Sequence, residues 1–298
     1  MQKIGFIGIG IMGKPMAKNL LDAGYSLIAY DINKDALEEI VVYGAEKCSS
    51  CQEIASRCDI IITMLPNSPN VKKAVLTKEG VINGVHAGQI LIDMSSIAPL
   101  VTREVARELS KKGVEMLDAP VSGGQEKAQL GTLAIMVGGK EEIFNQCKEI
   151  LKIMGKPVLV GDIGAGQTTK LVNQTIVAIN IAAVAEGLIF GKKAGVDPER
   201  IFEAIKGGLA GSQCLTDKAP RMFKGNYDPG FRMKLHVKDL TNVLETSREL
   251  HTAMPLSAQV MEMMQTLMAN GHTEADHGGL ALFYEKLNSI SLKKPDTP

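Results

Sequence analysis

Glycines near the start of the chain have the spacing of a phosphate-binding turn. Gly8, Gly10 and Gly13 fit G-x-G-x-x-G, after the apolar run Lys3–Gly8, which reads as a strand, and before a helical stretch, Lys14–Ala23. In that context the first glycine permits a tight turn, the second lets a pyrophosphate approach the backbone, and the third lets helix and strand pack closely. The helix N-terminus adds free N–H groups and a positive dipole end. The pattern predicts a dinucleotide site formed by Gly8, Ile9, Gly10, Ile11, Met12 and Gly13.

An acidic residue follows at the spacing expected for ribose recognition. Asp31 ends the second predicted strand, 18 positions after Gly13. A carboxylate there accepts hydrogen bonds from the adenine ribose and repels a 2′-phosphate, and Ile32 rather than an arginine comes next. We therefore predict NAD (NADH) as cofactor, with NADP less favoured; Lys34 nearby is the one feature that favours a 2′-phosphate. The alternative role for Asp31 is that of a helix N-cap.

Lys170 is an ionisable residue at the mouth of a long apolar stretch. Gln167–Ala194 is Ala-rich and free of proline, which predicts one helix about 40 Å long. An unpaired charge there is costly without a role, and a lysine is protonated at neutral pH, so it can stabilise and protonate a nascent oxyanion. Asn173, three residues on, shares its helical face and can orient Lys170 or hold a substrate hydroxyl. Helix spacing alone leaves an ordinary solvated lysine as an equal alternative.

Two further sets of residues have the character of ligand contacts. Ser122, Gly123 and Gly124 can converge backbone N–H groups and a hydroxyl on a carboxylate, although a plain strand-to-helix turn is the simpler reading. The second set follows the carboxyl ends of predicted strands, where cofactors bind in open α/β sheets. Its members are Leu65, Pro66, Asn70 and Ser96.

The elements that must position these residues alternate between strand and helix in the first half of the chain. This alternation predicts a mostly parallel, doubly wound α/β Rossmann domain over residues 1–163. The predicted strands are Lys3–Gly8, Leu27–Asp31, Ala45–Cys48, Ile60–Met64, Ile90–Asp93, Glu115–Asp118, Leu133–Val137 and Val158–Val160.

The second half of the chain, residues 164–298, has no convincing strand run and predicts an all-α domain joined through the long interdomain helix. Because that helix is apolar on all sides, we expect it to be buried between domains or subunits. Asp197 and Pro198 read as the N-cap and first position of the next helix. Helix breaks are predicted at Gly207-Gly208, Pro220, Asp228-Pro229-Gly230 and Asn270-Gly271, with a disordered tail from Lys293.

Composition excludes several classes of function. Lys+Arg and Asp+Glu both number 33, so a basic face for nucleic acid or an anionic membrane is not expected. No stretch reaches roughly 20 unbroken apolar residues, and the first strand begins too early for a leader, which predicts a cytoplasmic protein. The five cysteines and five histidines form no metal-like set, so we expect free thiols, no metal and no covalent nucleophile.

Four segments, in order, resemble the signatures of the β-hydroxyacid dehydrogenase family. Phe6–Leu20 is similar to its N-terminal signature, and Asp118–Gly124 to its substrate loop. Gly164–Gln174 is similar to its catalytic segment, and Gly230-Phe231 with Lys238-Asp239 to its C-terminal motif. The resemblance covers nearly the whole chain.

The resemblance implies that Lys170 is the catalytic lysine and Asn173 its partner, although Gln174 stands where some relatives have a second asparagine. It also implies that Ser122, Gly123, Gly124, Asn173 and Gln174 bind substrate, and that Phe231 and Lys238 lie near the nicotinamide. A homodimer or homotetramer follows from the same likeness.

The stretches Ile62–Pro69, Ile92–Pro99, Gly207–Ser212 and Tyr284–Leu287 are most similar to family members that act on tartronate semialdehyde (2-hydroxy-3-oxopropanoate). The expected activity is its reversible NADH-dependent reduction to D-glycerate, with Lys170 as general acid and base. The enzymatic alternatives are 3-hydroxyisobutyrate, glyoxylate or succinic semialdehyde as substrate. The non-enzymatic alternative is an NAD-binding sensor or reader, against which the retained Lys170 argues.

Overall fold

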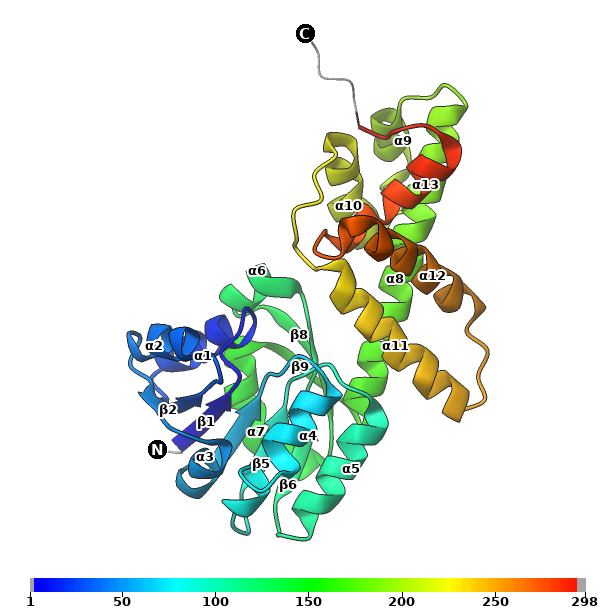
Figure 1. Cartoon of the computed structure of the whole chain (residues 1–298). Coiled ribbons are helices and arrows are strands. Elements are labelled where there is room, and N and C mark those ends of the chain that lie inside the picture. Colours follow the sequence, from blue (N-terminus) through cyan, green and yellow to red (C-terminus); the bar gives the residue numbers. More distant parts are fainter. Residues whose placement is uncertain (1–2, 294–298) are drawn as a thin grey trace. The chain divides into compact units, whose positions relative to one another are not determined.

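The computed structural model describes residues 3–293 and is drawn in Figure 1. Contacts divide the chain into two compact units, Met1–Lys170 and Leu171–Pro298. The predicted boundary at residue 163 precedes the long helix, whereas the contacts of that helix's first turn place the division after Lys170. Of the tail predicted to be disordered, residues 294–298 lie outside the described residues.

The first unit contains a nine-stranded sheet in the order β3-β2-β1-β4-β5-β6-β8-β7, with β9 paired to β8. The strands from β3 to β6 along this path are parallel; β8 is antiparallel to β6 and to β7, and parallel to β9. The bounds are β1 Lys3–Ile7, β2 Ser26–Tyr30, β3 Glu46–Lys47, β4 Ile60–Thr63, β5 Ile90–Asp93, β6 Glu115–Asp118, β7 Val121–Ser122, β8 Leu133–Gly138 and β9 Gly155–Gly161. The Rossmann prediction is confirmed, and all eight predicted strands are present; β7 was not predicted.

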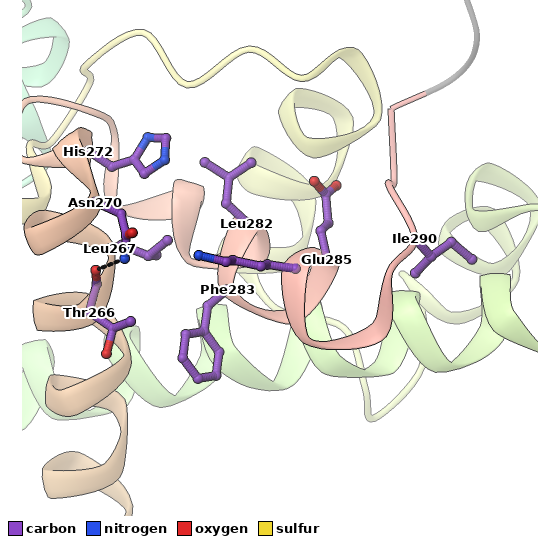
Figure 2. Close-up of a pocket in the computed structure, with 9 residues that line it drawn as sticks. Thr266, Leu267, Asn270, His272, Leu282, Phe283, Glu285 and Ile290 are labelled. Carbon is purple, nitrogen blue, oxygen red and sulfur yellow. Dashed lines mark hydrogen bonds between the residues drawn. The ribbon is translucent and has the colours of Figure 1, made fainter.

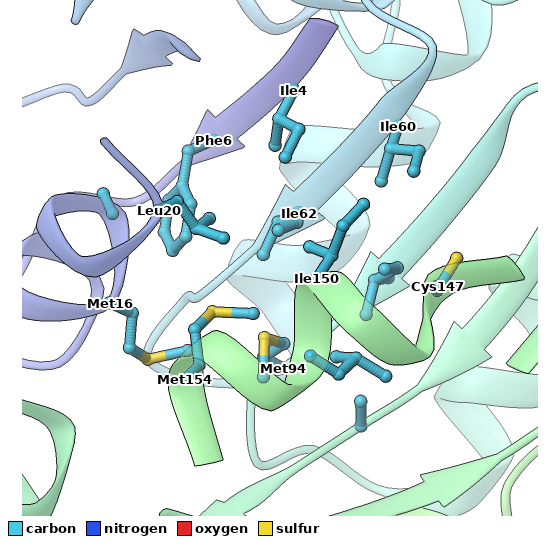
Figure 3. Packing of buried hydrophobic residues seen from close by; sticks show 14 of the residues in the cluster. Ile4, Phe6, Met16, Leu20, Ile60, Ile62, Met94, Cys147, Ile150 and Met154 are labelled. Atoms are coloured by element: carbon cyan, nitrogen blue, oxygen red, sulfur yellow. The ribbon is translucent and has the colours of Figure 1, made fainter. Parts of the chain in front are cut away.

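Helices cover both faces of the sheet, because its strands are apolar on both sides. Ile60 and Ile62 of β4 point into one layer and Ile61 into the other, as the twofold period of a strand requires. In Figure 3, Met16 and Leu20 of one helix and Ile150 and Met154 of another pack against that first face. The helices of this unit are α1 Gly13–Asp22, α2 Lys34–Val41, α3 Cys51–Arg57, α4 Ser68–Leu76, η1 Val81–Asn83, α5 Pro99–Ser110, α6 Gly124–Gln129 and α7 Glu141–Met154.

The second unit is helical in its described part, with a single isolated bridge between Arg232 and Asp276. Its core includes Ile181, Ala185, Met222, Leu240 and Met264. Its helices are α8 Ala165–Lys193, whose first turns belong to the first unit, then α9 Pro198–Ile205, α10 Gln213–Lys224, α11 Met233–Glu249, α12 Pro255–Leu267, η2 Met268–His272, η3 His277–Leu280 and α13 Ala281–Asn288.

Two local predictions for the helical unit had opposite outcomes. The Asp197 side chain accepts a hydrogen bond from the N–H of Glu199 and caps α9, as predicted. The predicted break at Pro220 is wrong, because Pro220 lies inside α10. Its neighbours Ala219 and Met222 are fully buried, and their packing offsets the backbone hydrogen bond that a proline cannot donate.

The long helix α8 is only partly buried within the single chain. One face is exposed, with Ile176 and Phe190 accessible to 54% and 76%, so the helix is not buried all round in this chain. By length and composition alone it is also apolar enough to cross a membrane, although polar residues such as Asn180 and Glu186 interrupt its apolar run. The buried side chains of α8, such as Ala178 and Ile181, belong to the core of the helical unit, and a core helix passes the same compositional test.

Candidate active site

The glycine-rich turn has the geometry that its sequence predicts. Gly8 has φ +99°, a conformation that favours glycine, and a Cβ there would lie 2.3 Å from the Met64 carbonyl oxygen. A Cβ on Gly13 would lie 1.9 Å from the Gly8 carbonyl oxygen, so this glycine permits α1 to start against β1. A Cβ on Gly10 would meet nothing within 4 Å. The space above Gly10 is therefore open to a ligand.

The N-terminus of α1 lies beside this space, where the Lys14 N–H donates to the Gly10 carbonyl oxygen. Met12 occupies the N-cap position, no side chain caps the helix, and its first turn contains no acidic residue. Ile11 and Gly10 are exposed, while Ile9 is buried. Uncapped N–H groups at a helix N-terminus suit a phosphate, so these residues fit the dinucleotide that the motif predicts.

Asp31 follows β2 and reaches back to the glycine turn. Its Oδ2 accepts a hydrogen bond from the Ile9 N–H (2.6 Å) and its Oδ1 one from the Asn33 N–H (2.7 Å). The N-cap of α2 is Asn33, so the alternative reading of Asp31 as a helix cap is wrong. Each carboxylate oxygen has a second lone pair, and Asp31 is only half-buried, so it can still accept from ribose hydroxyls.

The other predicted cofactor residues lie after the carboxyl ends of β4 and β5, which are neighbours in the sheet. Leu65 donates its N–H to Ser95 Oγ (2.9 Å), which ties the two loops together. Asn70 donates its N–H to Asn67, the N-cap of α4. Pro66 is exposed and Ser96 half-buried. The sheet thus brings Leu65 and Ser96 to the carboxyl-terminal edge, where Gly8 follows β1.

The predicted carboxylate loop turns sharply at its two glycines. Ser122 ends β7, and Gly123 and Gly124 have φ +137° and +69°. A Cβ on Gly123 would lie 2.7 Å from the Lys127 side chain, so a larger residue is excluded there. Gly124 begins α6, and no side chain caps this helix. Its first N–H groups are thus available to an anion.

Lys170 lies on α8 and is buried, with an exposed fraction of 5%. The helix is anchored by Asp118 at the end of β6, whose two carboxylate oxygens accept hydrogen bonds from the N–H groups of Gly164 and Gln167, both at 2.7 Å. Burial raises the pKa of Asp118, while these two hydrogen bonds oppose the rise. The anchor fixes the start of α8 at the same edge of the sheet as the cofactor residues.

In the helical unit a hydrogen-bonded chain joins the remaining predicted residues. Asn173 donates its amide to Gln174 Oε1 (2.8 Å), and Gln174 donates to Asp239 Oδ2 (2.6 Å). Asp239 Oδ1 is paired with Lys238 Nζ (2.9 Å). Both ends of the Gln174 amide are therefore engaged with Asn173 and Asp239.

A buried pair of histidines, which sequence spacing did not reveal, extends this chain. His236 Nε2 lies 3.1 Å from the Gln174 carbonyl oxygen, and His236 Nδ1 lies 2.9 Å from His277 Nδ1. Phe231 packs against both rings. Burial and the neighbouring His236 hold the pKa of His277 well below its usual value. His236 and His277 are 41 residues apart, so no local pattern could predict the pair.

A groove of about 320 Å³ lies elsewhere in the helical unit and is drawn in Figure 2. It contains none of the predicted site residues. Its lining consists of Thr266, Leu267, Asn270, His272, Leu282, Phe283, Glu285, Lys286 and Ile290. Among the described residues, no group of three or more His, Cys, Asp or Glu side chains could hold a metal ion.

Known proteins resemble this chain along almost its full length. Residues 3–164 match the NAD binding domain of 6-phosphogluconate dehydrogenase, and residues 164–284 match the domain described as NAD-binding of NADP-dependent 3-hydroxyisobutyrate dehydrogenase. The 2-hydroxy-3-oxopropionate reductase of Escherichia coli (strain K12) is 42% identical over 97% of this chain and 99% of the relative. The 2-(hydroxymethyl)glutarate dehydrogenase of Eubacterium barkeri is 37% identical over 97% of both.

A solved structure agrees with these relatives. Mycobacterium tuberculosis 3-hydroxyisobutyrate dehydrogenase with L-serine superposes with a TM-score of 0.87 at 28% identity, over 95% of this chain and 99% of that chain. The glycine turn and the Rossmann sheet lie within the first matched range, and most of the helical unit lies within the second. The chain belongs to the β-hydroxyacid dehydrogenase family of oxidoreductases, in the group of 3-hydroxyisobutyrate dehydrogenase.

Proposed function

We propose that the protein reduces tartronate semialdehyde (2-hydroxy-3-oxopropanoate) to D-glycerate with NADH, and that Lys170 donates the proton. The observation that carries this proposal is the burial of Lys170 near an anchored helix start. Lys170 is a buried lysine one helical turn after Gln167, whose N–H donates to Asp118 at the end of β6.

The glycine turn and Asp31 would hold the dinucleotide, which would supply the hydride that the aldehyde carbon accepts. The chain must then hold the substrate and meet the charge that develops on the carbonyl oxygen. The Ser122 hydroxyl at the end of β7 and the uncapped N–H groups after Gly123 suit the substrate carboxylate. Lys170 Nζ stabilises the oxyanion and transfers a proton to it, and Asn173 holds the adjacent hydroxyl.

The substrate choice is supported by the relative in Escherichia coli, whose name gives the same reaction. Other relatives act on 2-(hydroxymethyl)glutarate or 3-hydroxyisobutyrate by name, so these compounds belong in any test. The cofactor choice is supported by Asp31, whose carboxylate would face a 2′-phosphate, although one matching family domain is described as NADP-dependent.

The experiment is a steady-state comparison of tartronate semialdehyde, methylmalonate semialdehyde (the aldehyde of 3-hydroxyisobutyrate), 2-formylglutarate (the aldehyde of 2-(hydroxymethyl)glutarate), succinic semialdehyde and glyoxylate with NADH and NADPH. We expect the highest kcat/KM for tartronate semialdehyde with NADH. Lys170→Ala should lower kcat about 10²- to 10⁴-fold while NADH still binds, because a general acid contributes that much. Lys193→Ala, an exposed lysine at the other end of α8, is the matched control and should retain native kcat. Native turnover by Lys170→Ala would refute the proton-donor role.

We also propose that the protein is a homodimer or homotetramer, with the exposed face of α8 covered by another copy. Ile176, Ala183 and Phe190 are exposed and share one face of this helix by their spacing. Exposed apolar surface of this extent is costly in a monomer. Light scattering should give a multiple of the 32.0 kDa chain mass, and Phe190→Asp should lower it. A native protein of monomer mass at micromolar concentration would contradict this.

A further inference from the structure

A single glutamine side chain joins α8 to the loop after β5. Gln167 is fully buried, and its Nε2 donates a hydrogen bond to the Ser95 carbonyl oxygen (2.6 Å). Its Oε1 accepts one from the Ile97 N–H (3.0 Å). The two main-chain groups lie on either side of Ser96, a predicted cofactor contact. The amide therefore holds this segment by both of its neighbours.

The start of α8 is fixed from the opposite side as well. The Gln167 main-chain N–H donates to Asp118 at the end of β6, as described above. Gly166 has no room for a side chain, since a Cβ there would lie 2.4 Å from the Met136 carbonyl oxygen and 2.5 Å from that of Asp118. The first turn of the helix thus contacts the strand ends directly, and an axial shift would break several close contacts at once.

The same segment also contacts the loop after β4. Ser95 Oγ accepts the N–H of Leu65, and the Ser95 N–H donates to Asp93 Oδ1 (3.1 Å). Thr63 donates to the same Asp93 oxygen (2.8 Å). Hydrogen bonds therefore connect the ends of β4 and β5 to the first turn of α8, and Gln167 provides the side-chain link between the loops and the helix.

We infer that Gln167 is a positioning residue for the proton transfer, acting through Lys170. This inference rests on the proposed role of Lys170. The two residues are three positions apart, which is about 4.5 Å along the helix axis and close to the same face. The amide of Gln167 sets how far the helix lies from the loop that contains Ser96, and hence the distance between the Lys170 amine and the reacting carbonyl. A displacement of about 1 Å can lower turnover about a hundredfold.

The test must separate positioning from the plain structural role of a buried amide. Gln167→Met removes both side-chain hydrogen bonds at similar volume. Gln89→Met is the matched control, because Gln89 is also buried and donates to the carbonyl oxygens of Ala55 and Cys58, both at 2.6 Å. It precedes β5, whereas Ser95 follows that strand, so its hydrogen bonds lie at the opposite edge of the sheet.

We expect both methionine variants to lower the Tm by several degrees, because each leaves buried main-chain groups unpaired. Only Gln167→Met should lower kcat, by about a hundredfold, with the Kd for NADH within about threefold of the native value. Equal loss of kcat in Gln89→Met, or native kcat in Gln167→Met, would overturn the inference.

A double variant shows whether Gln167 acts through Lys170. Single-turnover rates with tartronate semialdehyde and NADH are compared for the native enzyme, Gln167→Met, Lys170→Ala and the double variant. If Gln167 positions Lys170, the Gln167→Met substitution should lower the single-turnover rate of the native enzyme. It should have no further effect when Lys170 is already replaced by alanine. If the same fold-loss appears in both backgrounds, the inference fails although Lys170 stays the donor. If Lys170→Ala itself retains the native rate, the proposed function fails, and the inference with it.

Gln167→Glu provides a second readout if the methionine variant does not fold. A protonated glutamic acid can donate to the Ser95 carbonyl oxygen and accept from the Ile97 N–H, whereas an ionised one cannot donate to Ser95. The ratio of variant to native kcat should therefore rise as the pH is lowered from 8 to 6. A ratio independent of pH would contradict the positioning role.

Discussion

Gly10 and Gly13 are two glycines of the same turn, yet the structure assigns them different roles. Two alanine variants can separate these roles. A Cβ at Gly10 meets nothing within 4 Å, and its φ lies outside the left-handed region. Gly10→Ala should therefore leave the free energy of unfolding unchanged, or raise it by up to about 1 kcal/mol through the unfolded chain. The cost should appear only when the dinucleotide binds.

The size of that cost follows from what the new methyl group displaces. If the pyrophosphate lies against this backbone, the methyl forces its oxygens away from the N–H groups at the start of α1. Losing one or two hydrogen bonds to a charged group costs about 3 kcal/mol, or roughly a hundredfold in Kd. A fluorescence titration with NADH measures this directly, with a thermal denaturation of the same sample as the stability control.

Gly13→Ala should behave in the opposite way. Its Cβ would lie 1.9 Å from the Gly8 carbonyl oxygen, so α1 or the turn must move in the free protein. Overpacking of this kind costs about 1–3 kcal/mol or more, and the Tm should fall. If Gly10→Ala binds NADH with native Kd, the pyrophosphate does not lie over Gly10. If Gly10→Ala is as unstable as Gly13→Ala, the inference that the space above Gly10 is open is wrong.

Three further predictions concern charge. Asp31→Asn keeps an oxygen that can accept from the Ile9 N–H but removes the negative charge. The ratio of kcat/KM for NADPH to kcat/KM for NADH should therefore rise about tenfold. An unchanged ratio would mean that Asp31 does not face the 2′ position of the ribose. Burial raises the pKa of Asp93 to about 6, so the folded state binds its proton more tightly than the unfolded chain does. The contribution of Asp93 to the free energy of unfolding is full below pH 3.8 and is lost as the pH rises through 6. The total loss is about 3 kcal/mol. The free energy of unfolding of Asp93→Asn, measured by urea denaturation, should not show this loss. His277 has the opposite sign: burial lowers its pKa, so its contribution to stability is full above pH 6.5 and is lost as the pH falls below it, and His277→Asn should remove that dependence.

The sequence predicts the sheet well because each strand is an apolar run bounded by turn residues. Ile90–Asp93 and Glu115–Asp118 agree with the structure to the residue, since both strands are buried on both faces. The prediction misses β7, because two residues are too short for any periodicity. It fails at Pro220, where tertiary packing overrides a local breaker.

The candidate site is predictable only where its residues are consecutive. The glycine turn and the Ser122 loop are local motifs, and the structure gives both the expected positive-φ glycines. The anchors of α8 are not local: Asp118 is 46 and 49 residues from the N–H groups that it accepts. A buried Gln or Asp within an apolar sequence indicates that a partner exists, but only the fold identifies that partner.

Asp93 and His277 lie in different units, Met1–Lys170 and Leu171–Pro298, and their opposite signs make pH a probe of how the two units unfold. Below pH 6 the Asp93 contribution to stability rises on acidification, whereas the His277 contribution falls. If the chain unfolds in one cooperative step, the two slopes offset each other, and each single variant exposes the other group's slope. If the units unfold separately, calorimetry should resolve two transitions that move in opposite directions as the pH falls, with Asp93→Asn fixing only the first and His277→Asn only the second. Two transitions that shift together would show that neither group controls the pH dependence of its unit.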